Sequence, residues 1–336
     1  MSSRVNLVPN PLDRFRELYE ILNTDRAWFH DASPLRFAAM TAVTCPGTVA
    51  EVAMAIREMA EEIKDRSGWF GELKSPLRFI VSAILVMNGD KAGAFLEDVK
   101  QGRELFRQAQ LRRGGIYEMM ALLIMRLQHD LQPVRIESVT RFQAIYEEMK
   151  RHHWWLTGPD DFPACAILVG QQGTPVEIGE SIEDIYQALN GFGFSKGDPL
   201  QTAANLLFLA RLDPQVVAGR YAELAAGFRQ SGVSIWQSDY DELAILSFLD
   251  HPAQRIVEHV LECREQMSQL KPAPGRLMTF NLAASLVFLE LVQLDGNLDA
   301  ITDAKALMDM QAIINAQQAA AAAAATSAAT AASSSN

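Results

Sequence analysis

Apolar residues along this chain follow two alternating helical patterns. In the first pattern almost every position is apolar, as in residues 79–87, 119–127, 203–212 and 280–291. In the second, apolar residues recur three and four positions apart, as at Phe142, Ile145, Tyr146 and Met149. The first pattern predicts helices buried on all sides, and the second predicts amphipathic helices with one face in water. Their alternation predicts pairs that each contain one inner and one outer helix.

The helix pairs repeat with a fixed period. Trp28, Trp69, Trp154 and Trp236 are separated by 41, 85 and 82 residues, and Leu111 and Phe194 occupy the positions that the two longer intervals skip. The sequence Ser-Pro-Leu-Arg-Phe also occurs twice, at residues 33–37 and 75–79. Such a period is typical of stacked helical repeats. We predict an all-α fold, an α-solenoid of about seven TPR- or HEAT-like helix pairs of about 41 residues each, either an open superhelix or a compact block.

Capping residues support the predicted helix starts. A side chain that accepts hydrogen bonds precedes a proline at Ser33, Ser75, Thr174, Asp198 and Asp213, as expected at the start of a helix. Three further pairs have the spacing of a capping box or of its Asp variant: Thr48 with Glu51, Thr174 with Glu177, and Ser238 with Asp241.

The end of the chain differs in composition. Residues 319–336 are almost only Ala, Ser and Thr, which offers no apolar face to bury. We therefore predict a helical-repeat domain over residues 1–315 and a disordered or frayed tail over residues 316–336.

Composition narrows the classes of partner. The chain has 30 Lys and Arg against 41 Asp and Glu, with a net charge of −11, which argues against a nucleic-acid partner. Cys45, Cys165 and Cys263 are far apart and indicate core thiols in a reducing compartment. No segment has the pattern of a signal peptide or a membrane-spanning helix. We expect a cytoplasmic protein that binds no membrane.

Three segments carry a resemblance to a known family. They are residues 150–163 (KRHHWWLTGPDDFP), residues 68–79 with their GWF and SPLRF sequences, and residues 193–198 (GFSKGD). Over roughly residues 12–294 the chain resembles a bacterial family named domain of unknown function 4003. The resemblance implies a bacterial, intracellular helical protein, and it supplies no catalytic residues.

The densest polar cluster in the sequence contains His152, His153, Asp160 and Asp161. Imidazole and carboxylate groups ligate Zn, Fe or Mn, so these four residues are the candidate metal site. In the alternative interpretation the basic residues stabilise the end of one helix, and Asp160 or Asp161 caps the next. We favour the structural interpretation because the spacing matches no established ligand pattern.

Two arginines, Arg36 and Arg78, occupy equivalent positions in the repeated Ser-Pro-Leu-Arg-Phe sequence. We favour an ion pair with an acid of a neighbouring repeat, such as Glu72 or Asp31, over binding of an anionic ligand.

The aromatic row of Trp28, Trp69, Trp154 and Trp236 also has two interpretations. We expect these side chains to pack between helix pairs, and the alternative is a surface for a peptide or another extended ligand. Together with Arg36 and Arg78, they are the candidate binding residues.

Two classes of function fit this pattern. The first is a helical-repeat scaffold or regulator that binds a protein, a peptide or a small ligand, since helical arrays most often work in this way. The alternative is a metal-dependent enzyme built around the His-Asp cluster. We find no nucleophile-elbow, zinc-protease or dinucleotide-binding motif. The sequence therefore predicts no cofactor other than a divalent metal at that cluster.

Overall fold

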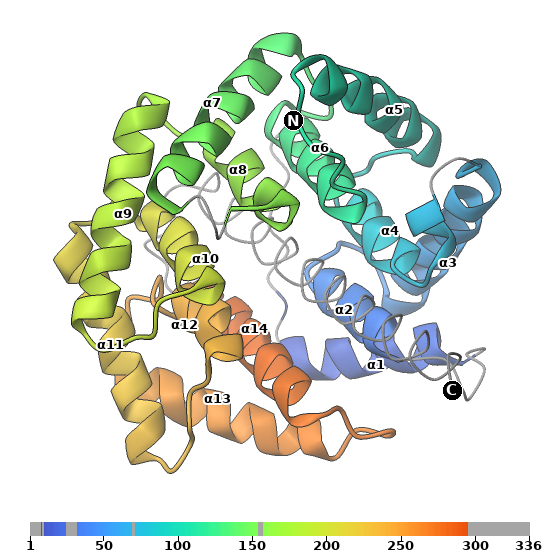
Figure 1. The fold of residues 1–336 in the computed structure, drawn as a ribbon. Helices are drawn as coiled ribbons and strands as arrows, with labels where there is room; N and C mark the ends of the chain where they lie inside the picture. The colour runs from blue at the N-terminus through green and yellow to red at the C-terminus, as the bar shows by residue number, and fades with distance from the viewer. Residues whose placement is uncertain (1–7, 9, 25–31, 69–70, 154–156, 295–336) are drawn as a thin grey trace, which may run out of the picture. The chain divides into compact units, whose positions relative to one another are not determined.

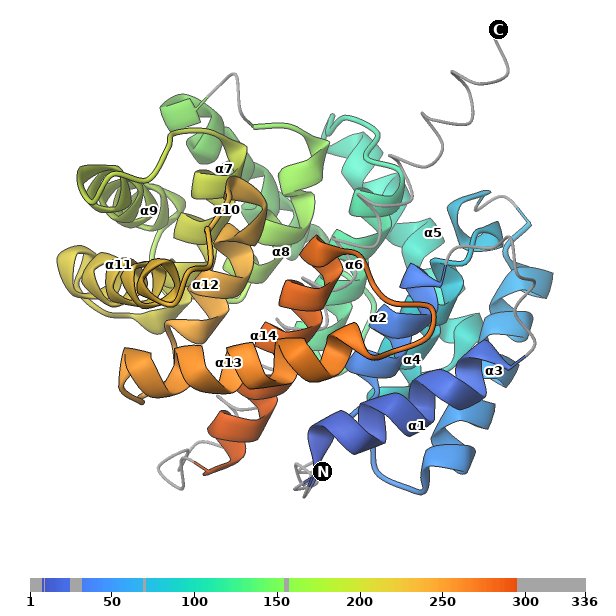
Figure 2. The same ribbon diagram turned by 90° about the horizontal axis from the view of Figure 1, so that it is seen from below.

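The computed structural model describes residues 8, 10–24, 32–68, 71–153 and 157–294, and all regular elements in these ranges are helices (Figures 1 and 2). The all-α prediction is confirmed for this part of the chain. The described residues divide into two compact units. The N-terminal unit comprises residues 8–104 and 115–133, and the C-terminal unit comprises residues 105–114 and 134–294.

The N-terminal unit contains the first six α-helices, with the last residues of α5 assigned to the C-terminal unit. They are α1 (Pro11–Asn23), α2 (Ser33–Thr41), α3 (Val49–Arg66), α4 (Arg78–Met87), α5 (Ala92–Gln108) and α6 (Ile116–Gln128). A short 3-10 helix, η1 (Gly71–Lys74), precedes α4.

The C-terminal unit contains eight further α-helices. They are α7 (Ile136–His153), α8 (Phe162–Val169), α9 (Pro175–Gly191), α10 (Asp198–Leu207), α11 (Pro214–Gln230), α12 (Tyr240–Leu246), α13 (Ala253–Ser268) and α14 (Arg276–Leu294). Three 3-10 helices lie beside them: η2 (Pro159–Asp161), η3 (Phe208–Ala210) and η4 (Gln237–Asp239).

Helices buried on most sides alternate with amphipathic helices within each unit. Residues 34–41 of α2 are all buried, whereas α3 buries one row of side chains that includes Val52, Ile56 and Ile63. In the C-terminal unit α8 is buried along most of its length, and α7 buries Phe142, Ile145, Tyr146 and Met149. The predicted alternation of inner and outer helices is confirmed here, because the apolar runs and the apolar stripes are the surfaces that leave water.

Helices pack against the next helix and against the next but one along the chain. In the N-terminal unit α1 contacts α2 and α3, and α4 contacts α2 and α3. In the C-terminal unit the outer helices α7, α9, α11 and α13 contact one another in series. The inner helices α10, α12 and α14 do the same and run side by side in Figure 1.

Three of the predicted helix caps are confirmed, and two of the predicted capping residues lie one position inside their helices. Thr48 and Thr174 form complete capping boxes with Glu51 and Glu177, and Asp213 accepts hydrogen bonds from the backbone N–H groups of Gln215 and Val216. Ser33 and Asp198 are instead the first residues of their helices.

Two other predicted caps are wrong. The Ser75 hydroxyl donates a hydrogen bond to the Glu72 carbonyl, and α4 begins only at Arg78. The pairing of Ser238 with Asp241 is replaced by an Asp239 carboxylate that accepts from the Trp236 N–H at 2.8 Å. In both places a short 3-10 turn precedes the inner helix and takes the capping hydrogen bonds.

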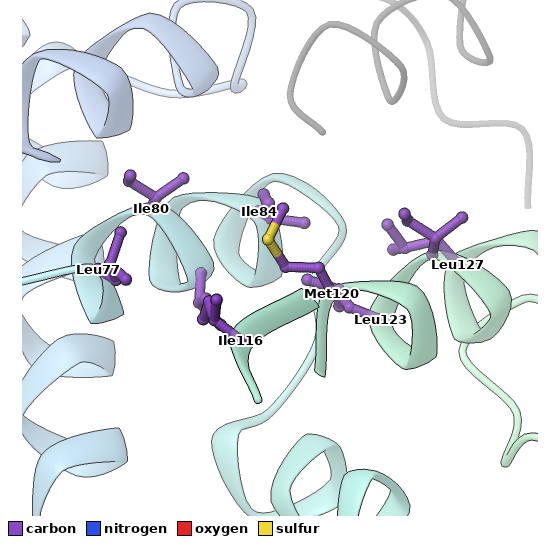
Figure 3. Close-up of a pocket in the computed structure, with 9 residues that line it drawn as sticks. Leu77, Ile80, Ile84, Ile116, Met120, Leu123 and Leu127 are labelled. Atoms are coloured by element: carbon purple, nitrogen blue, oxygen red, sulfur yellow. The ribbon is translucent and has the colours of Figure 1, made fainter. Parts of the chain in front are cut away.

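A small apolar cavity lies between α4 and α6 in the N-terminal unit (Figure 3). Ile80 and Ile84 line it from α4, and Met120 reaches toward Ile84 from α6. Its volume of about 10 Å³ is barely enough for a single water molecule, and every lining side chain is apolar. The cavity is therefore a packing feature of this unit.

Among the described residues, no single helix is both long and apolar enough to cross a membrane. The pair α4 and α5 meets the length and composition criteria only when combined, and the two helices are bent by 110° at their junction.

Candidate functional site

The four residues of the candidate metal site lie in the C-terminal unit, at the end of α7 and in η2. His153 is buried, and its Nε2 lies 2.7 Å from Oε2 of Glu183 on α9. The imidazole ring also contacts Tyr186 of α9, with 4.4 Å between ring centroids. His152 Nε2 lies 3.4 Å from Oε1 of Glu148, which is one turn earlier on α7. The two histidines therefore contact different carboxylates.

The two aspartates are also in different environments. Asp161 is buried, and its Oδ2 accepts a hydrogen bond from the Gly158 N–H at 2.9 Å, which closes the η2 turn. Asp160 is exposed. Burial raises the pKa of Asp161 to about 7, the Gly158 N–H opposes this rise, and the charges of Asp160 and Asp198 add to it. The capping interpretation thus applies to Asp161, although it caps a 3-10 turn and not α8.

No group of three or more His, Cys, Asp or Glu side chains is placed to hold a metal within the part of the chain that the structure describes. The two residues of the predicted site that are buried lie beside different protein groups: His153 is beside the Glu183 carboxylate, and Asp161 accepts from the Gly158 N–H. The metal site stays a prediction, without a ligand cluster in the described residues.

The two candidate arginines have different surroundings. Arg36 is 4% exposed, and its guanidinium lies 5.2 Å from the centre of the Tyr19 ring. Arg78 lies 3.6 Å from Oε1 of Glu61 and donates to the carbonyls of Lys74 and Ser75. The difference follows from position, because Arg36 is inside α2 whereas Arg78 is the first residue of α4.

Arg78 forms an ion pair, as predicted, but its partner is Glu61 and not Glu72. Glu72 pairs with Arg103 at 3.2 Å, and Glu61 of the preceding outer helix takes its place beside Arg78. Asp31 lies outside the described residues.

The aromatic row is only partly described, since Trp28, Trp69 and Trp154 lie outside the described residues. Trp236 is 58% exposed, with the Arg276 guanidinium 5.7 Å from the centre of its ring. Phe194, at an equivalent position of the predicted period, is buried against Tyr221 and Tyr240. Packing is therefore confirmed for Phe194 and is wrong for Trp236.

Two arginines outside the predicted set make matching hydrogen bonds in the two units. Arg14 of α1 donates to the carbonyls of residues 43, 45 and 47, and Arg141 of α7 donates to those of residues 169, 171 and 173. Each set of carbonyls lies at or after the end of an inner helix and before the capping box of the following outer helix. Corresponding carbonyls are 126 residues apart, as are Thr48 and Thr174. Fixed arginine donors satisfy carbonyls that a helix end leaves without partners.

Polar side chains that sequence reasoning missed lie inside the buried helices of the C-terminal unit. Gln201 and Asn205 are one turn apart on α10, and Asn281 is on α14; all three are at most 3% exposed. Gln201 Nε2 lies 3.5 Å from Oγ1 of Thr157, whose hydroxyl donates to the His153 carbonyl. This contact connects α10 to the end of α7.

Several atoms of these amides have no hydrogen-bond partner among the described residues. They are both polar atoms of the Asn205 side chain, Oε1 of Gln201 and Oδ1 of Asn281. A buried polar atom without a partner is unusual in a folded protein and requires an explanation. The available sequence signal was an amide side chain within a mostly apolar run, as Asn205 is within residues 203–212 and Asn281 within residues 280–291.

Comparison with known proteins places the chain in a family. The family model described as Protein of unknown function (DUF4003) matches residues 18–319, which is most of the chain. The chain belongs to this family. The resemblance found in the sequence is confirmed, and the match extends beyond the expected residue 294 to residue 319.

The chain is also similar to an uncharacterised protein, YeaA, from Bacillus subtilis (strain 168). It is 27% identical over 270 residues, which covers 78% of each chain. No solved structure matches the chain.

The single repeat domain predicted over residues 1–315 stays a prediction, as does the tail over residues 316–336.

Proposed function

We propose that this chain is a helical-repeat binding protein, a scaffold or regulator, and that the inner helices of its C-terminal unit contact the ligand. The ligand is a protein, a peptide or a small molecule, and it is neither nucleic acid nor a membrane. The repeat interpretation is supported by the alternation of inner and outer helices within each unit. It is also supported by the matching Arg14 and Arg141 contacts and by the two capping boxes that follow them.

The observation that carries the binding proposal is the Asn205 side chain. It is 3% exposed, and neither of its polar atoms has a partner among the described residues. Leaving a buried amide without partners costs about 1 to 3 kcal/mol. A ligand that bonds to the amide in the complex offsets this loss, as is common for polar residues at binding sites.

The chemistry of the site indicates the kind of ligand. Side-chain amides both donate and accept hydrogen bonds, as peptide groups do. Gln201 and Asn205 on α10 and Asn281 on α14 present such amides from two of three inner helices that pack in series. The partner that fits them is an uncharged group with both donors and acceptors, such as a peptide backbone or a small amide.

The test is a comparison of thermal unfolding with and without compounds. Full-length protein is screened by differential scanning fluorimetry against amino acids, dipeptides and nucleosides, beside the Asn205→Leu variant. We expect Asn205→Leu to unfold at a higher temperature than wild type, because it replaces an unsatisfied amide by an apolar group of similar size. At least one compound should stabilise wild type and leave the variant unchanged.

Asn190→Leu is the matched control. Its Nδ2 donates to the Phe194 carbonyl at 2.9 Å, so this substitution removes a formed hydrogen bond and should lower the unfolding temperature. The proposal is wrong if Asn205→Leu also unfolds at a lower temperature, since a water molecule or a neighbouring group then satisfies Asn205 in the free protein. It is also wrong if no compound separates wild type from Asn205→Leu.

A further inference from the structure

A groove runs between the outer helices α9 and α11 of the C-terminal unit. The two helices pack side by side in both ribbon views (Figures 1 and 2). The groove has a volume of about 580 Å³, and Asp184, Gln187, Gly191 and Phe192 of the α9 side face Asp213 and Gln215 of the α11 side. This volume lies within the range of sites that bind small molecules or peptide side chains.

Phe192 is an apolar side chain in this groove that folding does not bury. It is 49% exposed, whereas Phe194, two residues later, is 3% exposed and packs against Tyr221 and Tyr240. Leu212 and Val216, which flank Asp213 on the α11 side, are 41% and 50% exposed. Of the nine large apolar side chains that are exposed among the described residues, Phe192 lines this groove, and Leu212 and Val216 are within three residues of Asp213 in the sequence. Such a concentration is typical of interaction surfaces.

The carboxylates of the groove give it a negative charge from both sides. Asp184 belongs to α9, which contains four acidic residues and no Lys, Arg or His. Asp213 uses one oxygen, Oδ1, to cap α11, which leaves Oδ2 for another partner. The arginines that flank Asp213 in the sequence have other contacts: Arg211 lies 3.4 Å from Oε1 of Gln171, and Arg220 lies 3.7 Å from Asp250.

We infer that the α9–α11 groove binds a peptide segment of a partner protein in which a Lys or Arg stands beside an apolar residue. The basic group lies between Asp184 and Asp213, and the apolar residue packs on Phe192. A cation placed over the Phe192 ring gains a further attraction from the π electrons. Because ion pairs at an exposed groove are screened by salt, binding is salt-dependent, and the carboxylates contribute specificity and association rate more than affinity.

The experiment selects peptides from a displayed library of random sequences on the full-length protein and measures a selected peptide by fluorescence anisotropy. We expect enrichment of Lys or Arg next to an apolar residue. Phe192→Ser and Asp184→Lys should each raise the dissociation constant of the selected peptide by about tenfold or more. Asp213 is left unchanged because it caps α11.

Glu258→Lys is the matched control. Glu258 is exposed on α13, so the variant carries the same change in net charge outside the groove and should bind the peptide as wild type does. Asn205→Leu should also bind as wild type, which separates this inference from the proposed site on the inner helices. The inference is overturned if the library yields no peptide, if the selected peptides are acidic, or if Phe192→Ser binds them with unchanged affinity.

Discussion

Asp161 is a buried carboxyl group directly before α8. Burial is the main cause that raises its pKa from 3.8 to about 7, so the folded protein keeps a proton that the unfolded chain releases. Between these two values the folded state binds more protons than the unfolded state. Linkage then requires the free energy of unfolding to fall as the pH rises from about 4 to about 7.

The first prediction tests this titration with Asp161→Asn, which keeps an oxygen to accept the Gly158 N–H but has no charge. Chemical unfolding at pH 5 and pH 8 should show wild type losing stability over this interval and the variant losing less. At about 1.4 kcal/mol per pH unit, the difference at pH 8 should reach a few kcal/mol in favour of the variant. The exposed neighbour variant Asp160→Asn should follow wild type closely. Equal pH dependence of wild type and Asp161→Asn would show that Asp161 ionises normally in the folded protein.

At the residue scale the sequence identified His153 and Asp161 as candidate site residues but did not indicate which groups they contact. The Glu183 that contacts His153 is 30 residues away on another helix, and nothing in the local sequence indicates this contact. Asn205 was missed for a different reason, because it lies within a run that is mostly apolar. Long-range contacts of polar groups depend on which helices pack together, and periodicity does not specify them.

The matching arginine contacts of the two units belong to the element scale. Arg141 Nε donates to the Val169 carbonyl at 2.9 Å, and its Nη2 donates to those of Gln171 and Gly173 at 2.7 and 2.9 Å. These bonds hold the loop between α8 and α9 against α7. Gly173 has a φ of +100°, a conformation that favours glycine, and it leads directly into the capping box of α9.

The second prediction is that Arg141→Met lowers the free energy of unfolding by about 2 to 3 kcal/mol, because three carbonyls lose a charged donor. Arg141→Lys should recover little of this loss, since one ammonium group cannot reproduce the planar fork of donors. Arg14→Met should behave like Arg141→Met, and Arg255→Met, at an exposed position of α13, should stay within about 0.5 kcal/mol of wild type. Urea unfolding of the four variants measures these values. If Arg141→Met is as stable as wild type, water satisfies the three carbonyls as well as the arginine does, and the prediction is wrong.

Helices were predicted well at the element scale because their signal is local. The apolar periodicity gave the inner and outer helices, and the capping boxes at Thr48 and Thr174 gave two of the helix starts. The predicted starts failed at Ser75 and near Trp236, where a 3-10 turn precedes the helix. In such a turn the side chain that makes the capping hydrogen bond is one or two residues away from the position that it has in a regular α-helix.

The extent of the folded region is a property of the whole molecule. The family match ends at residue 319, where the Ala-, Ser- and Thr-rich segment begins. Before that point, Ile301, Leu307, Met308 and Ile314 recur at helical spacing, so residues 301–314 have apolar side chains to bury. Residues 320–336 contain no large apolar side chain. The change in composition and the end of the family match therefore fall at the same place in the sequence.

The last prediction concerns two truncated chains that differ only in this region. A chain that ends at residue 319 should unfold at the same temperature as the full chain, because the removed residues have almost no apolar surface to lose. A chain that ends at residue 294 should unfold several degrees lower, because it lacks the apolar residues of 301–314 that the family match includes. Thermal unfolding followed by circular dichroism compares the three chains. If the chain ending at 294 unfolds like the full chain, residues 295–319 contribute nothing to stability. If the chain ending at 319 unfolds earlier, the Ala-rich segment stabilises the protein despite its composition.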